Sequence, residues 1–161
     1  MMRRVFLSAL LALSPLALIE AGEVPYASCF DQAAARYQVD PVLLRAIARV
    51  ESGFNPAAIG KNARSEDIGV MQINSSWLPT LARHGISREH LFDPCLNIHI
   101  GAWVLSQNIA SMGATWKAVG AYNARSEDKR QVYVGKVWKA YQKEVALAGP
   151  SGKTMHALRA F

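Results

Sequence analysis

Glu51 is an acidic residue on the apolar side of a predicted helix. Asp40 followed by Pro41 predicts the start of this helix, because the Asp side chain accepts free amide hydrogens and proline fits the first helical position. The apolar stripe of the helix consists of Leu43, Leu44, Ile47 and Val50. Glu51 follows Ile47 by four positions and projects along this stripe. Burial raises the pKa of a carboxyl, which suits a group that donates a proton to a leaving oxygen near neutral pH.

A solvated position at the edge of the stripe, or an ion pair with a nearby arginine, is the alternative interpretation of Glu51. The residues that follow favour a site. The helix is expected to end at about Ser52, and Gly53 to Ile68 has the composition of a long loop. A helix end that faces a loop is a common place for a functional side chain.

The run from Gly69 to Asn74 is the second unusual feature. Gly69 permits close approach of the backbone to a ligand. Met71 offers an adaptable wall, and Gln72 offers a donor and an acceptor to a sugar amide or hydroxyl. Core packing, with Gln72 bonded to a backbone group, explains the same pattern equally well.

Tyr122 and Asn123 form the third feature, in the run Ala121-Tyr122-Asn123. A Tyr hydroxyl in a cleft can orient a catalytic carboxyl, whereas a core aromatic with a hydrated tip is the alternative. The segment from Asn123 to Asp128 also repeats, letter for letter, the segment from Asn62 to Asp67. Six residues are too few for a structural repeat, and the identity has no physical explanation at this stage.

The elements that must position these residues are almost all helical. Ser28 with Asp31 predicts a helix cap before a segment that runs to about residue 38. Further helices are expected over about 40–52, 75–83, 93–111 and 129–146, with a short one after Thr115. The last of them has an apolar stripe of Val134, Val137, Trp138, Tyr141 and Val145. Only 69–73 could pair briefly as a strand, so the fold is predicted to be mainly α.

The composition predicts one folded domain behind an export signal. The 161 residues are 51% hydrophobic and 19% charged, which excludes a disordered chain, and the net charge of +6 suits anionic surroundings. Arg3 and Arg4 precede an uncharged run from Val5 to Ile19, which is interrupted by Pro15 and is too short to span a membrane. Residues 1–21 are therefore predicted to be a signal peptide that is removed, leaving a periplasmic protein without a membrane anchor.

Two cysteines, Cys29 and Cys95, remain after this processing. An even count in an oxidising compartment predicts one disulfide between them. The alternative, Cys29 as a lipid-modified N-terminus, lacks the expected Leu before it and would leave Cys95 alone.

No cofactor, metal or nucleic acid is expected. The histidines, which show no paired metal-ligand spacing, are His84, His90, His99 and His156. The basic residues are dispersed, with no helix that concentrates them on one face, so nucleic acid is excluded as a partner.

Together, Glu51-Ser52, the run from Gly69 to Ile73 and Ala121-Tyr122-Asn123 resemble the lytic transglycosylases with a lysozyme-like (goose-type, SLT) fold. The chain is similar, more narrowly, to small exported members that accompany type III and type IV secretion, conjugation and type IV pilus machines. The narrower likeness rests on Cys29-Phe30, Asp67-Ile68 and the run from Phe92 to Asn97. It covers about residues 28 to 145.

The resemblance implies that Glu51 is the single acid and base in cleavage of peptidoglycan glycan strands. Glu51 would protonate the bond between N-acetylmuramic acid and N-acetylglucosamine. It would then deprotonate the muramic 6-hydroxyl, giving a 1,6-anhydro product. Intramolecular attack requires no second carboxylate. The residues that the resemblance assigns to the cleft around the substrate are Ser52, Gly69, Met71 and Gln72. It implies that Tyr122 hydrogen-bonds near Glu51 and that Asn123 supports the local structure.

The resemblance implies a catalytic domain over 28–148, with components of an envelope-spanning machine as partners. Residues 22–27 are expected to be a short N-terminal segment. Residues 149–161 are basic, contain glycine and have no apolar face to bury, so they are expected to be a flexible tail. Family members commonly carry a glycine where this chain has Arg125. Two alternatives stay open: a lysozyme-type hydrolase that uses Asp67 or Asp93 as a second carboxylate, and a non-catalytic wall-binding scaffold.

Overall fold

The computed structural model describes residues 24–124 and 126–148. The predicted signal peptide over 1–21 and the predicted basic tail over 149–161 lie outside these residues, as does Arg125. Within them the fold is mainly α with one small sheet, as expected. None of the helices in this described part is long and apolar enough to cross a membrane.

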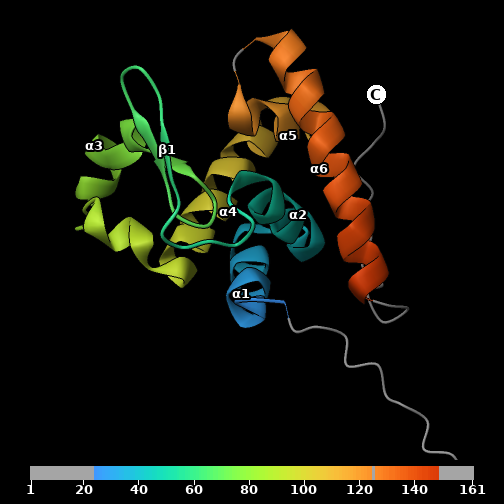
Figure 1. Cartoon of the computed structure of the whole chain (residues 1–161), viewed down its shortest axis with the longest axis horizontal. Helices are drawn as coiled ribbons and strands as arrows, with labels where there is room; N and C mark the ends of the chain where they lie inside the picture. Colours follow the sequence, from blue (N-terminus) through green and yellow to red (C-terminus); the bar gives the residue numbers. More distant parts are fainter. Residues whose placement is uncertain (1–23, 125, 149–161) are drawn as a thin grey trace, which may run out of the picture.

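Helices form most of the described chain (Figure 1). The helices are α1 (Ala27–Tyr37), α2 (Pro41–Glu51), α3 (Leu78–Ala82), α4 (Pro94–Met112), α5 (Trp116–Asn123) and α6 (Glu127–Ala148). Two 3-10 turns, η1 (Ser75–Trp77) and η2 (Glu89–Phe92), precede α3 and α4. The strands are β1 (Ile59–Lys61), β2 (Glu66–Ile68) and β3 (Ile73–Asn74).

The two Asp-Pro pairs start helices as predicted. Asp40 Oδ1 accepts a hydrogen bond from the amide of Val42 at 2.7 Å, and Asp93 Oδ1 accepts one from Leu96 at 2.7 Å. The cap expected from Ser28 is wrong. Helix α1 begins at Ala27, after Tyr26 in the left-handed conformation with φ of 59°, and no side chain caps it.

The loop expected between Gly53 and Ile68 contains a β-hairpin, which is a correction to the prediction. Strand β1 pairs antiparallel with β2, with Ile59 opposite Ile68, and β2 pairs with β3, with Ile68 opposite Ile73. The sequence does not show β1 because none of its three residues is buried, and Ile59 is 45% exposed. Pairing to β2, rather than an apolar face, therefore makes it a strand.

Helix α2 lies in the middle of the helical part, with α6 packed along it and α1 beneath (Figure 1). Helix α4 packs against α1 and α5, and α5 packs against α6. The largest fully buried side chains of the core include Phe30, Leu44, Ile47, Ile98 and Leu105. The sheet, α3 and η2 form a smaller lobe to one side, so the chain between α2 and α4 leaves the helical part and returns to it.

The buried face of α6 differs from the predicted stripe. Val137 and Tyr141 are buried as expected, but Trp138 and Val145 are each 45% exposed. The other buried positions are Tyr133, Ala140 and Glu144. This set has helical spacing too, and contact with α2 selects it.

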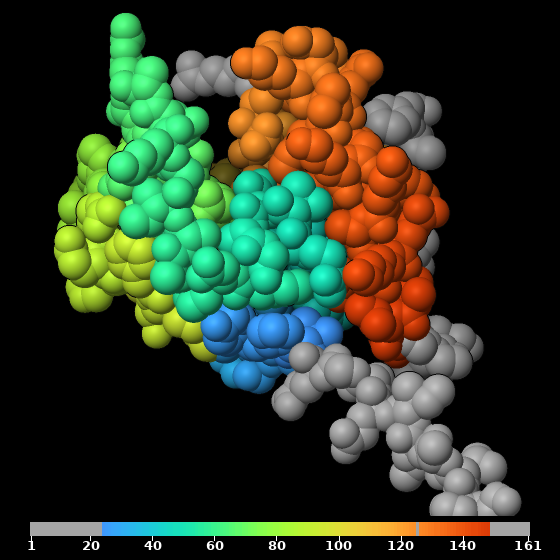
Figure 2. Space-filling model, viewed as in Figure 1, coloured from blue at the N-terminus to red at the C-terminus, as the bar shows by residue number. Residues whose placement is uncertain are grey.

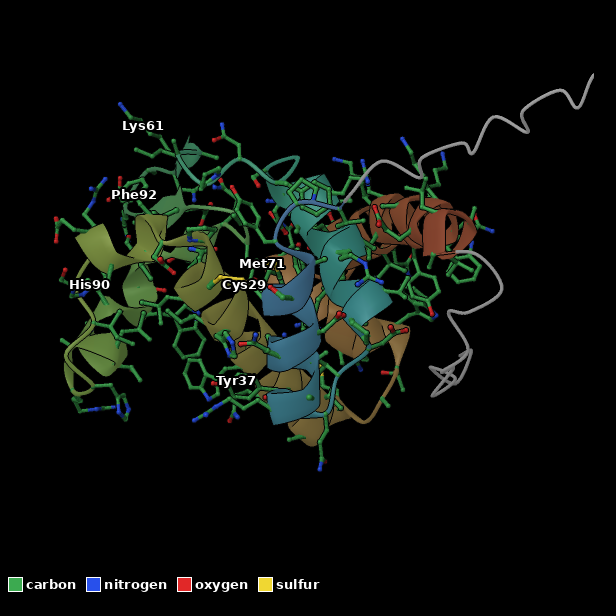
Figure 3. The ribbon with its side chains drawn as sticks, turned by 90° about the horizontal axis from the view of Figure 1, so that it is seen from below. Cys29, Tyr37, Lys61, Met71, His90 and Phe92 are labelled. Carbon is green, nitrogen blue, oxygen red and sulfur yellow. A yellow bond between two sulfur atoms is a disulfide. The ribbon has the colours of Figure 1, made fainter. Side chains whose placement is uncertain are left out.

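The predicted disulfide between Cys29 and Cys95 is confirmed. It joins α1 to the first turn of α4, with the two Cα atoms 5.2 Å apart (Figure 3). The bond links residues that are 66 positions apart in the chain. It therefore closes a large loop that contains α2 and the whole sheet.

Candidate active site

Glu51, the last residue of α2, lies in a cleft of about 670 Å³ between the sheet and the corner where α5 meets α6. Figure 2 shows this hollow between the green hairpin and the orange start of α6. We call it the main cleft. Its lining residues are Glu51, Asn62, Asp67, Gln72, Ile73, Asn74, Ser76, Trp77, Val104, Tyr122, Asn123, Ala124, Ser126 and Lys129.

The pKa of Glu51 is raised from 4.5 to about 7. Burial in the apolar stripe is the main cause, and the negative charge of Asp67 adds to it. A hydrogen bond from the Tyr133 hydroxyl to Oε1, at 2.5 Å, and the positive charge of Lys136 lower the pKa by less. The raised pKa predicted from the stripe is confirmed. Near neutral pH the carboxyl exchanges a proton readily and can serve as acid and as base.

A tight turn over residues 69–72 forms one wall behind the main cleft, and Asn97 holds it. The side chain of Asn97 is fully buried and donates to the carbonyls of Ile68 (2.9 Å) and Leu91 (2.8 Å). Its Oδ1 accepts from the amide of Met71 at 2.7 Å. A Cβ on Gly69, whose φ is 78°, would lie 2.5 Å from Asn97 Nδ2. The close approach at Gly69 is therefore to Asn97, inside the protein.

Ser52 and Tyr122 are bonded to the same turn. Ser52 Oγ donates to the Val70 carbonyl at 2.7 Å, and the Tyr122 hydroxyl donates to the Met71 carbonyl at 2.9 Å. The side chain of Met71 is fully buried, and the space beside it is so small that a Cβ on Gly101 would lie 2.8 Å away. Ser52, Gly69 and Met71 thus support the wall from behind.

Glu51, Gln72, Tyr122 and Asn123 are the predicted site residues that line the main cleft. Gln72 Nε2 donates to the carbonyls of Gly69 (2.9 Å) and Ala58 (3.2 Å). Its amide nitrogen is therefore bonded to the backbone, as the alternative interpretation of the sequence had it. The hydroxyl bonded to Glu51 belongs to Tyr133 rather than to Tyr122. Sequence reasoning did not select Tyr133, because the apolar stripe that it predicts for this helix runs through Val134 instead.

The two carboxylates considered as hydrolytic partners lie in different places. Asp67 lines the main cleft and accepts hydrogen bonds from the amides of Asn62 and Asn74, each at 2.7 Å. Asp93 caps α4 and is not among the residues that line the main cleft. Among the residues that the structure describes, no group of three or more His, Cys, Asp and Glu side chains gathers as metal ligands do.

Both copies of the repeated hexapeptide border the main cleft. Asn62 and Asp67 come from the first copy, at the hairpin, and Asn123, Ala124 and Ser126 come from the second, between α5 and α6. The sequence alone did not indicate that the copies face one cleft. Nothing in the structure explains why they are identical.

Comparison with known proteins shows which family the chain resembles in sequence. The family model for the transglycosylase SLT domain matches residues 28–145. Invasion protein IagB of Salmonella typhimurium is 42% identical over 124 residues, covering 73% of this chain and 78% of that protein. Protein IpgF of Shigella flexneri is 43% identical over 107 residues, covering 65% of this chain and 70% of that protein.

A solved structure has the same fold. An inactive mutant of lytic transglycosylase Slt from Pseudomonas aeruginosa matches 82% of this chain with a TM-score of 0.65 at 22% identity. This chain corresponds to 25% of that chain, so the likeness concerns one part of it.

The fold and its cleft carboxyl define a lysozyme-like domain of the kind that cleaves glycans. The chain belongs to the transglycosylase SLT domain family. Its class is that of the peptidoglycan lytic transglycosylases, as the resemblance implied.

Replacing Tyr133 by Phe should raise the pKa of Glu51 above 7. The substitution removes the hydroxyl that lowers this pKa, and a hydrogen bond to a charged group is worth about 1.5 kcal/mol, or roughly one pH unit. The measurement is an NMR titration of the Glu51 side-chain carboxyl. The matched control is Tyr122→Phe. The hydroxyl that it removes is bonded to the Met71 carbonyl, so this variant should leave the pKa of Glu51 unchanged. Equal shifts in both variants would contradict the assignment.

Replacing Glu51 by Gln should stabilise the protein at alkaline pH. Because the pKa of Glu51 is raised in the folded state, the folded protein holds this proton more tightly than the unfolded chain does. The stability that this provides is fully present below about pH 4.5 and is lost as the pH rises through about 7. At pH 8 the ionised carboxylate therefore costs stability, up to about 3 kcal/mol.

Urea unfolding of Glu51→Gln and of the parent at pH 4.5 and pH 8 checks this expectation. The variant should have the higher midpoint at pH 8, with the difference shrinking toward pH 4.5. Glu66→Gln is the control. The hydrogen bond from Arg88 lowers the pKa of Glu66, so this variant should not gain stability at pH 8 relative to the parent. A gain for Glu51→Gln that does not depend on pH would mean that the carboxyl is not desolvated.

Proposed function

We propose that Glu51 acts first as the acid and then as the base in a cleavage of peptidoglycan that consumes no water. The observation that carries this proposal is the state of the carboxyls in the main cleft. Glu51 is bonded to one hydroxyl and has a pKa of about 7, whereas Asp67 is occupied by two amides. One carboxyl is therefore equipped to give and take a proton, which suits a mechanism with an internal nucleophile.

The proposed reaction proceeds in two steps. Protonated Glu51 donates its proton to the oxygen that joins the anomeric carbon of N-acetylmuramic acid to N-acetylglucosamine, and the bond from that carbon to the oxygen breaks. The resulting Glu51 carboxylate then takes the proton of the muramic 6-hydroxyl, whose oxygen bonds to the anomeric carbon. The products are a 1,6-anhydromuramic end and an N-acetylglucosamine with a free 4-hydroxyl. Glu51 ends protonated, ready for another cycle.

Tyr133 is the positioning residue of this proposal. Its hydroxyl donates to Glu51 Oε1, so it holds the carboxyl in one orientation and stabilises the carboxylate that exists between the two steps. Tyr122, Gln72 and Asn123 line the space that the sugars would occupy. The amide nitrogen of Gln72 and the hydroxyl hydrogen of Tyr122 are given to backbone carbonyls, so these two side chains offer acceptor oxygens to a glycan. The exposed amide of Asn123 can both donate and accept.

Peptidoglycan and the Glu51→Gln variant test the reaction. The parent should release muropeptides with anhydro ends, and Glu51→Gln should release at least about a hundredfold fewer, since general acid and base catalysis contributes 10²–10⁴. Mass spectrometry of the released muropeptides reads the outcome, and Asp67→Asn is the comparison variant. Products heavier by one water, with activity lost in Asp67→Asn as well, would replace the proposal with hydrolysis.

We also propose that the protein is exported to the periplasm and opens the wall locally for an envelope-spanning machine. The charged start and uncharged run within residues 1–21 support export. The relative in Salmonella typhimurium is named an invasion protein, which supports a role beside such a machine.

N-terminal sequencing of the protein from a periplasmic fraction tests export, and a cytoplasmic protein that keeps Arg3 and Arg4 would overturn it.

A further inference from the structure

A second recess adjoins Glu51 on the side away from the sheet. It has a volume of about 370 Å³ and lies between the end of α2 and the first three turns of α6. We call it the basic recess. Its lining residues are Val50, Glu51, Asn123, Asp128, Lys129, Val132, Tyr133 and Lys136. Glu51, Asn123 and Lys129 border both this recess and the main cleft, so the two spaces meet at the carboxyl.

Two exposed lysines give the basic recess its charge. Lys129 and Lys136 are seven positions apart on α6, which places them on the same face two turns from each other. Neither is among the described residues that form ion pairs, whereas Arg49 and Arg130 of the same two helices are paired with Glu144 and Glu127. The charge of Lys136 acts on Glu51 and that of Lys129 acts on Asp128. Neither lysine is held in an ion pair within the described residues, so both ammonium groups can still turn to an anion from outside.

The acidic groups of the recess are already engaged. Asp128 is hydrogen-bonded to Ser126, which lowers its pKa. Glu51 accepts from Tyr133. Apolar surface completes the recess, since Val132 is 63% exposed beside the lysines. The combination suits a ligand with carboxylates and small apolar groups.

The main cleft has a different chemistry. Its polar lining is largely neutral, from Asn62, Gln72, Asn74 and Asn123, with Trp77 as an aromatic surface. Neutral amides and an aromatic face suit the sugars of a glycan. A glycan strand with acidic substituents would therefore find its sugars matched in one space and its charges matched in the other.

We propose that the basic recess binds the carboxylates that the muramyl sugar carries, with Lys129 and Lys136 as their partners, while the sugars lie in the main cleft. The proposal rests on the proposed function, which places the muramyl sugar at Glu51. A substituent on that sugar then lies next to the place where the two spaces meet. The carboxylates have two possible sources, the peptide attached to the sugar or the free lactyl group of a strand without peptide.

Binding to three ligands separates these sources and tests the proposal. The ligands are peptide-bearing glycan, the same glycan stripped of peptide by an amidase, and a neutral N-acetylglucosamine oligosaccharide. The protein is the full chain with Glu51→Gln, so that no ligand is cleaved. The recess variant is this protein with Lys129→Gln and Lys136→Gln added. The matched control is Lys139→Gln with Lys143→Gln, which removes the same charge from exposed positions of α6 that do not line the recess.

The recess variant should bind peptide-bearing glycan about tenfold more weakly at low salt, since each exposed charge pair contributes modestly. The loss should shrink at high salt. Binding of the neutral oligosaccharide should not change, and the control variant should bind all three ligands as the parent does. Loss confined to peptide-bearing glycan assigns the peptide, and equal loss on stripped glycan assigns the lactyl carboxylate. Both outcomes support the recess.

An equal loss on the neutral oligosaccharide, an equal loss in the control variant or no loss at all would overturn the proposal. Lys136 also lowers the pKa of Glu51. Binding is measured in the Glu51→Gln background, so an effect through that carboxyl can appear only in cleavage. Cleavage by the chain with Glu51 intact distinguishes the two effects. An electrostatic effect on Glu51 moves the pH profile of cleavage and leaves KM unchanged, whereas loss of carboxylate binding raises KM. Absence of cleavage by the parent would refute the proposed function without affecting the binding result.

Discussion

The buried amide of Asn97 is the contact on which the geometry of the site depends. It satisfies three backbone groups, of Ile68, Leu91 and Met71, at the point where the sheet joins α4. A buried amide of this kind is costly to remove, because backbone groups away from water would lose a partner. Gly69 is required there because no side chain fits beside the amide. The wall behind the main cleft is thereby fixed to the helical core.

The acid depends on a second set of contacts, between α2 and α6. Glu144 is 1% exposed and pairs with Arg49 at 2.5 Å, and the Tyr141 hydroxyl donates to Asp40 at the opposite end of α2. These contacts set the position of Tyr133 against Glu51. The partners that each carboxylate receives explain their different chemistry. Glu144 has a cation as its partner. Glu51 has a single hydroxyl, and its burial raises its pKa.

Several features of the protein were determined by the sequence itself. The Asp-Pro pairs start α2 and α4 because capping involves only neighbours in the chain, and the place of Glu51 on an apolar stripe follows from helical spacing. The helical fold class and the pairing of Cys29 with Cys95 were likewise predictable. The family motifs indicated the class of enzyme.

The tertiary structure decided which groups meet. Two faces of α6, one through Val134 and one through Tyr133, have equally good helical spacing, and only packing against α2 selects Tyr133 as the partner of Glu51. The hairpin at residues 59–68 forms through pairing between strands that carry no alternating pattern. The turn behind the cleft is supported by Ser52, Gly69 and Met71, which do not line the cleft. The sequence did not indicate this, because the partners of these residues are distant along the chain. Local patterns depend on neighbours along the chain, whereas these choices depend on contacts that exist only after the chain has folded.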